Sequence, residues 1–261
     1  MPILTCPVCG SALTAKERAF VCESGHSFDL AKEGYLNLLL STQHRSRHPG
    51  DAPELCRARR AFLSAGYYAP LREFVADRLQ GDVVLDACCG EGYYTSAFAL
   101  RGHDTYGFDI AKDMVRLAAK ADKRSFYFVA GLHRIPVESG SVDTLTHLFA
   151  PFADEEFRRV LKDGGTLLTV LPGEVHLWQL KQALYETPYR NRETPPQTGL
   201  TLVSKERLRF EIDLRTREDI LNLYRMTPYS YKTSPDAEQK LCALKSLRTT
   251  VDFVVLTYRK G

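Results

Sequence analysis

The sequence predicts an α/β fold, in which a Rossmann-like, mainly parallel sheet carries helices on both faces and follows a small N-terminal metal-binding module. From residue 81 onward, short apolar strands that end in aspartate alternate with helical patterns, which is typical of a βαβ nucleotide-binding unit. Three cysteines and a histidine gather within residues 6–26, a segment too short to bury a core of its own. We therefore expect three parts: a zinc-binding ribbon in residues 1–40, a basic linker and helix in 41–80, and the α/β domain in 81–261.

The N-terminal segment has the ligand spacing of a zinc site. The first two ligands are separated by two residues and the second two by three, with twelve residues between the pairs. This spacing suits the tetrahedral nitrogen and sulfur coordination that zinc prefers, and Gly10 and Gly25 allow the tight turns it needs. The predicted ligands are Cys6, Cys9, Cys22 and His26. Because four protein ligands fill the site, we expect a structural zinc ion in a ribbon of two small hairpins.

Disulfides in a secreted protein, or four unrelated residues, are the alternatives for these cysteines. Residues 1–5 have neither the basic region nor the apolar stretch of a signal peptide, so a reducing, cytoplasmic location is expected. With 44% hydrophobic and 26% charged residues, the composition is ordinary for a globular protein. No apolar run approaches the length of a membrane-spanning helix, so we expect no membrane partner.

Basic residues concentrate in the linker. The net charge of +3 does not by itself indicate a nucleic-acid partner, but residues 44–60 hold five arginines. A Pro-Gly-Asp turn interrupts them, and the residues that follow have helical spacing. Such charges are commonly a solvated helix face, whereas beside a zinc ribbon they are a candidate RNA-binding surface. The candidates are Arg45, Arg47, Arg57, Arg59 and Arg60.

The segment 81–121 carries the most informative pattern. A buried strand at 83–85 ends in Asp86, and a second strand at 104–108 ends in Asp109, with a helical pattern after each. Asp109 lies about twenty residues past the glycines of the first turn, where a carboxylate can bind ribose hydroxyls. That turn reads CCGEG, so it has neither the GxGxxG of a pyrophosphate loop nor the GxSxG of a hydrolase elbow.

This turn resembles motif I of the class I S-adenosylmethionine-dependent methyltransferases, in CGEGYYT and in the preceding Asp86. The resemblance implies S-adenosylmethionine as cofactor, with Gly90 and Gly92 admitting its methionine end close to the backbone and Asp86 facing its ammonium. Because this cofactor has no pyrophosphate, an acidic Glu91 is acceptable at the helix N-terminus. Cys88 stands where the family more often has its first glycine, a departure that concerns the geometry of the loop.

The whole chain resembles the bacterial 23S ribosomal RNA (guanine-N1)-methyltransferases of the RlmA type. Zinc ribbon, basic loop and methyltransferase cassette come in the same order, and the resemblance is dense in RSRHPGD, ARRAFLSAGYYAPL and LPGEVHLWQLK. It implies methylation of a guanine in a hairpin of 23S rRNA, a homodimer, and zinc modules that help to recognise the RNA. Which of two nearby guanines is modified, and whether the modification confers antibiotic resistance, are left open.

The resemblance also implies cofactor contacts from Tyr68, Tyr94, Thr95 and His176, although Tyr68 would serve equally well as a core aromatic. The implied reaction is direct attack of guanine N1 on the sulfonium methyl, which requires alignment and loss of the N1 proton. No catalytic base is assigned. The histidines considered, by location only, are His133, His147 and His176.

Because N1 lies on the pairing edge, the base has to be unpaired or flipped out. Residues 224–231, with the sequence YRMTPYSY, are a candidate stacking element or an ordinary strand or helix end. Two other functions stay open at this point. One is a methyltransferase that acts on a small molecule or lipid, and the other is a non-catalytic RNA-binding protein with a degenerate cofactor loop.

Overall fold

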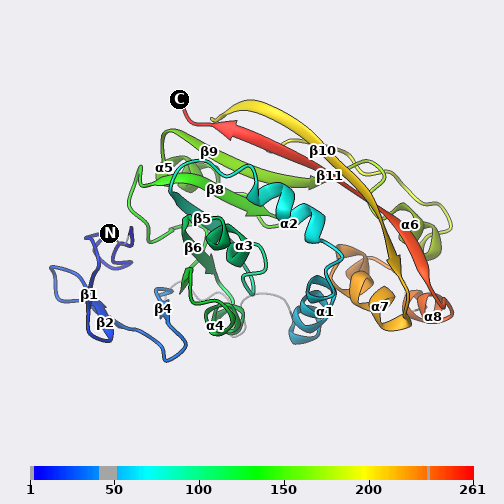
Figure 1. Ribbon diagram of the computed structural model, residues 1–261, viewed down its shortest axis with the longest axis horizontal. Helices are drawn as coiled ribbons and strands as arrows, with labels where there is room; N and C mark the ends of the chain where they lie inside the picture. Colours follow the sequence, from blue (N-terminus) through cyan, green and yellow to red (C-terminus); the bar gives the residue numbers. More distant parts are fainter. Residues whose placement is uncertain (1–2, 41–51, 234–235) are drawn as a thin grey trace.

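The computed structural model describes residues 3–40, 52–233 and 236–261. Within them, the main element is an eight-stranded sheet in the order β10-β11-β9-β8-β5-β6-β7-β4 (Figure 1). Its strands from β4 to β9 pair in parallel, and β11 and β10 add to β9 in antiparallel fashion. The strands are β4 (Tyr35–Asn37), β5 (Val83–Ala87), β6 (Asp104–Asp109), β7 (Phe126–Val129), β8 (Val142–Leu148), β9 (Leu161–Pro172), β10 (Thr201–Leu214) and β11 (Leu247–Arg259). The predicted Rossmann-like sheet is confirmed.

Helices cover both faces of this sheet. Consecutive residues of β5 point to opposite faces, so that Val84 packs in one hydrophobic cluster with α2 and α3, whereas Leu85 packs in another with α5. α4 packs against Tyr127 of β7. These helices are α2 (Ala69–Ala76), α3 (Thr95–Leu100), α4 (Lys112–Ala121) and α5 (Asp154–Val160). In the part of the chain that the structure describes, no helix has the length and apolar character needed to cross a membrane.

The helical pattern that follows the basic loop forms two helices with a turn between them. α1 (Pro53–Ser64) ends just before Gly66, which has a φ of +83°, and α2 begins at Ala69. Because a side chain is strained at this φ, glycine allows the chain to turn here. The turn places Tyr68 immediately before the first residue of α2, at the N-cap.

The zinc-binding segment is joined to the main domain by a shared core. It forms one three-stranded antiparallel sheet, in which the two expected hairpins share β2. Leu4 forms a β-bridge with Val137, and the rings of Phe20 and Phe126 lie 5.5 Å apart. β4, which lies within residues 1–40, pairs with β7 of the main sheet. The strands of the ribbon are β1 (Thr14–Lys16), β2 (Ala19–Val21) and β3 (Ser27–Asp29).

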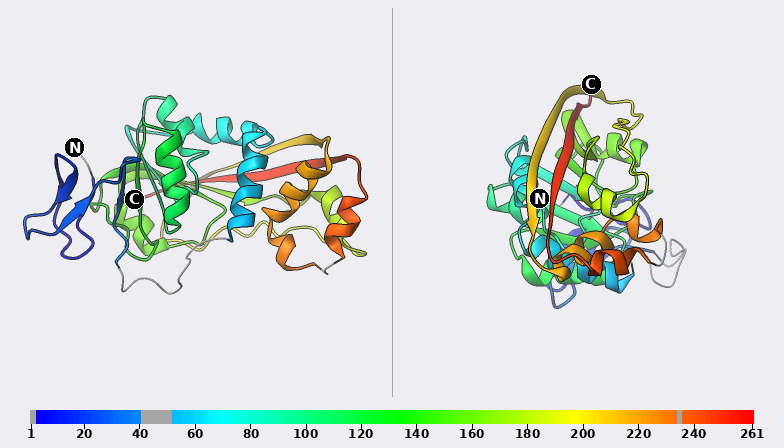
Figure 2. Two further views of the ribbon diagram at one scale, coloured as in Figure 1. Left: turned by 90° about the horizontal axis from the view of Figure 1, so that it is seen from below. Right: turned by 90° about the vertical axis from the view of Figure 1, so that its right-hand side faces the viewer.

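The opposite end of the molecule is built on the long hairpin of β10 and β11, which extends past the rest of the sheet (Figure 1; Figure 2, left). The first strand of this hairpin, β10, is one continuous strand of 14 residues. Because the helices at this end pack with one another, they form a second lobe remote from the ribbon. They are α6 (Trp178–Leu184), α7 (Arg217–Arg225), the 3-10 helix η2 (Pro228–Tyr231) and α8 (Ala237–Cys242).

Candidate active site and zinc site

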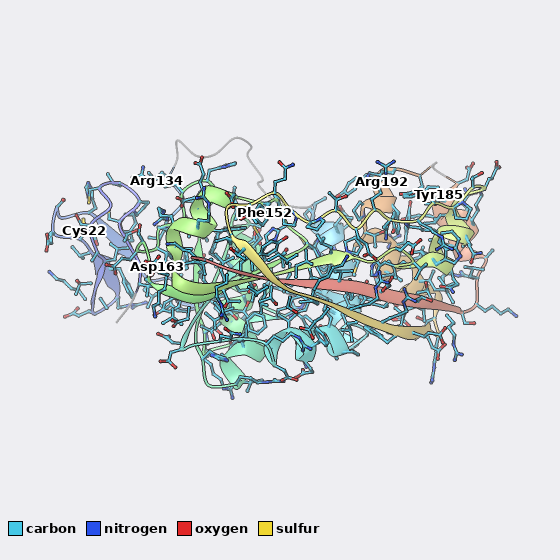
Figure 3. The ribbon with its side chains drawn as sticks, turned by 90° about the horizontal axis from the view of Figure 1, so that it is seen from above. Cys22, Arg134, Phe152, Asp163, Tyr185 and Arg192 are labelled. Atoms are coloured by element: carbon cyan, nitrogen blue, oxygen red, sulfur yellow. The ribbon has the colours of Figure 1, made fainter. Side chains whose placement is uncertain are left out.

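The four predicted zinc ligands converge at the outer end of the ribbon, the end marked by Cys22 in Figure 3. Their donor atoms all lie within 4.8 Å of one another. Cys9 Sγ is 3.6 Å from Cys22 Sγ, which in turn is 3.3 Å from His26 Nδ1. Tetrahedral bonds of about 2.0–2.3 Å place ligand atoms roughly 3.5–3.8 Å apart. The three thiols and one imidazole therefore fit a structural zinc ion, as predicted.

Asp86 lies at the carboxyl end of β5 and is almost fully buried. Thr95 Oγ1 donates to one carboxylate oxygen at 2.6 Å, and Thr146 Oγ1 donates to the other at 2.7 Å. Burial raises the pKa of Asp86 to about 6, and the two threonine hydroxyls oppose that shift. A buried carboxylate with so few partners is suited to a cationic ligand group, which is what the methionine ammonium would supply.

The loop after β5 adopts three left-handed backbone conformations in five residues. Cys88 has a φ of +58°, and Gly90 and Gly92 have φ of +56° and +77°. Cys88 thus takes the conformation that a glycine would adopt at this position, so the departure from the family pattern leaves the shape of the loop intact. A Cβ on Gly92 would lie 2.6 Å from the hydroxyl of Tyr127, whereas nothing lies within 4 Å of a Cβ on Gly90. Gly92 therefore has no room for a side chain, whereas the position of Cβ at Gly90 is open.

Asp109 fixes this loop from the end of β6. Its Oδ2 accepts a hydrogen bond from the Gly90 amide at 3.0 Å, and its Oδ1 accepts one from the Ala111 amide at 2.8 Å. β5 and β6 are parallel neighbours, so Asp86 and Asp109 come to the same edge of the sheet. The sequence-predicted residues Asp86, Gly90, Gly92, Thr95 and Asp109 are therefore brought together, and their individual cofactor contacts stay predictions.

Aromatic side chains from distant segments meet beside this edge. The ring of Tyr68 lies edge-on to Phe253 of β11 at 5.2 Å, and its hydroxyl is 3.5 Å from His176 Nε2. The His176 ring is 4.6 Å from Phe253. The buried hydroxyl of Tyr94 has no hydrogen-bond partner among the described residues. Since an unpaired buried hydroxyl is costly, Tyr94 is suited to a polar group of a bound ligand.

Comparisons with known proteins match both the zinc ribbon and the sheet that carries this site. Residues 4–47 match the family model described as "RlmA, N-terminal", a zinc ribbon, and residues 85–169 match that of a methyltransferase domain. The 23S rRNA (guanine(748)-N(1))-methyltransferase of Streptomyces fradiae is 34% identical over 249 residues, covering 89% of this chain and 87% of that protein. The putative 23S rRNA (guanine-N(1)-)-methyltransferase YxjB of Bacillus subtilis is 30% identical, covering 96% and 95%. The chain belongs to the 23S rRNA (guanine-N1)-methyltransferase family.

Other methyltransferases share a smaller part of the chain. The malonyl-[acyl-carrier protein] O-methyltransferase of Hamiltonella defensa is 29% identical over 150 residues, 51% of this chain. The guanine-N1 family matches instead along nearly the full length of both proteins. The chain is thus an S-adenosylmethionine-dependent enzyme, and neither the small-molecule alternative nor the non-catalytic one is favoured.

Two of the three histidines considered as a base in this methyltransferase have both nitrogens engaged. His147 Nε2 donates to the carbonyls of Ala150 and Pro151, at 2.8 and 3.0 Å, while its Nδ1 is 3.0 Å from Thr169 Oγ1. His176 Nδ1 accepts the Asp252 amide at 3.2 Å, so that the proton of the neutral ring sits on Nε2. Burial lowers the pKa of His176 to about 3. Neither imidazole is placed to take a proton, whereas His133 is exposed in the loop after β7.

Phe149, the first residue after β8, lies beside this site but is not among the residues that the sequence predicted for it. Its side chain is 51% exposed, its φ is +60°, and its ring lies 5.4 Å from that of Phe253. The signal was present as an aromatic residue directly after a strand of the parallel sheet, in the segment FAP. What the sequence could not indicate was its contact with β11, about a hundred residues later.

The candidate RNA-binding arginines divide into two groups. Arg45 and Arg47 lie outside the described residues. Arg57 is exposed on α1, where it pairs with Glu54 at 3.5 Å. Arg60 pairs at 3.4 Å with Glu91 of the cofactor loop. The helix that carries Arg57, Arg59 and Arg60 is therefore tied to the loop, and RNA contacts from these residues stay predictions.

Two of the three tyrosines in the proposed stacking segment at 224–231 are buried. Tyr224 and Tyr229 belong to the hydrophobic core of the second lobe. Tyr231 is 69% exposed and is the tyrosine of this segment that presents its ring to solvent. A stacking role stays a prediction for Tyr231 alone.

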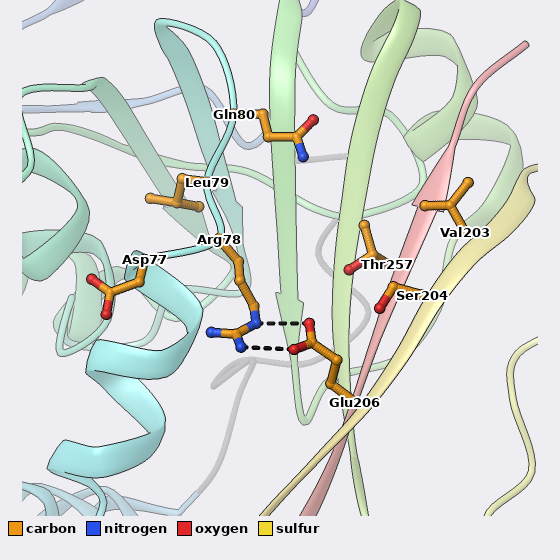
Figure 4. A pocket seen from close by; sticks show the side chains of 8 residues that line it. All are labelled: Asp77, Arg78, Leu79, Gln80, Val203, Ser204, Glu206 and Thr257. Carbon is orange, nitrogen blue, oxygen red and sulfur yellow. Dashed lines mark hydrogen bonds and ion pairs between the residues drawn. The ribbon is translucent and has the colours of Figure 1, made fainter.

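A pocket of about 350 Å³ lies elsewhere, between the end of α2 and strands β10 and β11 (Figure 4). Arg78 crosses it and donates two hydrogen bonds to Glu206, at 2.8 and 2.7 Å. Residues 77–80 precede β5, so the pocket is at the amino edge of the sheet, opposite Asp86. Its charged groups already hold α2 to β10, and it is not the cofactor site.

Proposed function

We propose that this methyltransferase transfers the methyl group of S-adenosylmethionine to N1 of a guanine in a hairpin of 23S rRNA. The named activities of its end-to-end relatives support this substrate. The observation that carries the proposal is the shared core of ribbon and sheet, in which Leu4 pairs with Val137 and β4 with β7. An RNA bound by the ribbon would be held in fixed relation to the cofactor loop.

When bound, S-adenosylmethionine supplies a methyl group already activated on a sulfonium. The protein then has mainly to orient donor and acceptor and to exclude competing water. In this proposal, Asp86 faces the ammonium, Asp109 shapes the loop while receiving the ribose hydroxyls, and Gly90 allows close approach to the backbone. Each role follows from position at the carboxyl ends of β5 and β6.

Loss of the N1 proton needs an acceptor that His147 and His176 do not provide, because their nitrogens are engaged. Of the histidines considered, His133 is left. Its exposure in the loop after β7 is compatible with contact to a bound RNA.

The substrate class can be tested by transfer of a labelled methyl group from S-adenosylmethionine to three acceptors: 23S rRNA, an unrelated RNA of equal length, and malonyl-acyl-carrier protein. We expect incorporation into 23S rRNA only. Incorporation into the carrier protein alone would refute the proposal and support a small-molecule type of acceptor. A zinc-loaded protein that labels neither RNA would refute it as well.

Two further expectations belong with this proposal. Since ribosomal RNA is the substrate, the proposed compartment is the cytoplasm. The homodimer implied by the family resemblance is tested by light scattering on the purified protein, where a mass near 29.5 kDa, that of one chain, would contradict it.

A further inference from the structure

We propose that Phe149 is the platform on which the acceptor base stacks during methyl transfer. The inference rests on the proposed function and specifies how this site would hold its substrate. The observations behind it are the position of Phe149 in the sheet, its backbone conformation, its support from beneath and its exposed ring.

Phe149 is level with the cofactor loop. β5 and β8 are adjacent and parallel, and their register pairs Ala87 with His147. β5 ends at this pair and runs into the CCGEG turn, and β8 ends one residue later at Leu148, so Phe149 leaves the sheet at the same edge as the turn. Ligands of open α/β sheets bind at this carboxyl edge. A base placed on the Phe149 ring would be next to the part of the loop that receives the methionine end.

The backbone of Phe149 is in an unfavourable conformation. Its φ of +60° lies in the left-handed region, which a bulky side chain rarely adopts. Burial does not account for this, because the side chain is 51% exposed. Glycine or asparagine would suit the same turn better. The strain at an exposed aromatic residue beside a binding site indicates that its ring has a function.

Neighbouring residues hold this turn in place. His147 donates from Nε2 to the carbonyls of both Ala150 and Pro151, so the chain on the far side of Phe149 is tied back to β8. Phe253 backs the ring at 5.4 Å and itself packs against Tyr68 and His176. The exposed part of the ring is thus presented on a rigid support.

The chemistry of the acceptor favours such a platform. Guanine can present N1 only after it leaves its base pair, and it then loses the stacking of its neighbours. An aromatic ring replaces that stacking for any base, because every base has a π-face. The pocket at the amino edge offers no comparable ring, since it is lined by polar and aliphatic side chains.

The test uses two variants of the full-length, zinc-loaded protein, Phe149→Asn and Phe149→Tyr. Asparagine tolerates the left-handed conformation, so Phe149→Asn should keep or raise the melting temperature while it removes the ring. We expect kcat/KM for the 23S hairpin to fall about 10- to 100-fold in Phe149→Asn, and to stay within about threefold in Phe149→Tyr. S-adenosylhomocysteine affinity, measured by calorimetry, should be unchanged in both.

A fluorescence measurement separates stacking from a merely structural role. With 2-aminopurine in place of the target guanine, wild type and Phe149→Tyr should quench the bound probe, whereas Phe149→Asn should leave it brighter. The matched control is Leu100→Asn, which removes another exposed apolar side chain, from the end of α3. It should change none of these readouts.

Three results would overturn the assignment: full activity of Phe149→Asn, loss of activity in Phe149→Tyr equal to that in Phe149→Asn, or a parallel loss of S-adenosylhomocysteine binding. The last would place the ring on the cofactor. Failure of the wild-type protein to methylate the hairpin is a different outcome, because it refutes the proposed function before the variants are compared.

Discussion

The zinc site and the active edge, by which we mean the carboxyl edge of the sheet with its aromatic cluster, are both formed by a few side chains. The sequence separation between those side chains is very different in the two sites. The zinc ligands lie within residues 6–26, whereas the aromatic cluster joins Tyr68, Phe149, His176 and Phe253. The first can be recognised from spacing alone, because a ribbon turn brings its own ligands together. The second exists only once β11 has inserted beside β9. Local sites are readable in a sequence, and assembled sites depend on topology.

Removing one zinc ligand tests the local site and should have the largest effect. In Cys9→Ser, zinc content should fall from about one equivalent to near zero, and methyl transfer to RNA should fall about 100-fold or more, because the ribbon loses the ion that orders it. Calorimetry should still detect S-adenosylhomocysteine binding, since β5 and β6 do not depend on the ion. Cys242→Ser, in α8 at the other end of the molecule, is the control. A Cys9→Ser protein that retains zinc and full activity would contradict the assignment.

A methyl group on Gly92 tests the cofactor loop at the active edge. Because its Cβ would lie 2.6 Å from the Tyr127 hydroxyl and φ is +77°, Gly92→Ala should destabilise the fold by about 2–4 kcal/mol and weaken S-adenosylhomocysteine binding. Gly102→Ala is the matched control, with a φ of +91° but nothing within 4 Å. It should cost only about 1 kcal/mol, measured by urea unfolding. Equal losses in the two variants would mean that the contact with Tyr127 is unimportant.

Asp86→Asn separates stability from function at the active edge. The folded pKa of about 6 exceeds the ordinary value of 3.8, so ionisation opposes folding, and the contribution of Asp86 to stability falls as pH rises through 4 to 6. Without cofactor, Asp86→Asn should therefore be more stable than wild type at pH 7, by roughly 2–3 kcal/mol, with the difference vanishing below pH 4. Cofactor affinity should fall. Urea unfolding at several pH values measures the first effect and calorimetry the second, and a less stable variant at pH 7 would contradict this account.

The sequence predicted the site residues that end strands, and it missed the contacts that form only in the folded chain. Asp86 and Asp109 were placed correctly because each ends an apolar strand of a repeating pattern. β4 was not recognised, since three residues carry too little pattern. Phe149 was overlooked because exposure, a positive φ and contact with Phe253 are properties of the folded chain.

The ion pair between α1 and the cofactor loop should show the smallest effect. Arg60 pairs with Glu91, and we expect it to contact an RNA phosphate as well. Arg60→Ala should weaken hairpin binding a few-fold and lower the salt dependence of log Kd by about one, with every sequence affected alike. Arg116→Ala, which breaks the exposed pair with Asp113 on α4, is the control. Filter binding at several salt concentrations compares both variants with wild type. Equal salt slopes for Arg60→Ala and wild type would show that Arg60 does not contact the RNA.

The central claim is that the cofactor and an unpaired guanine meet at the carboxyl edge of β5 and β8. Primer extension along 23S rRNA treated with S-adenosylmethionine and either wild type or Asp86→Asn tests it most directly, because a methyl group on N1 blocks base pairing. The account predicts arrest at a single hairpin guanine with wild type, and its loss or strong weakening with Asp86→Asn. Arrest outside a hairpin, or equal arrest with both proteins, would contradict it.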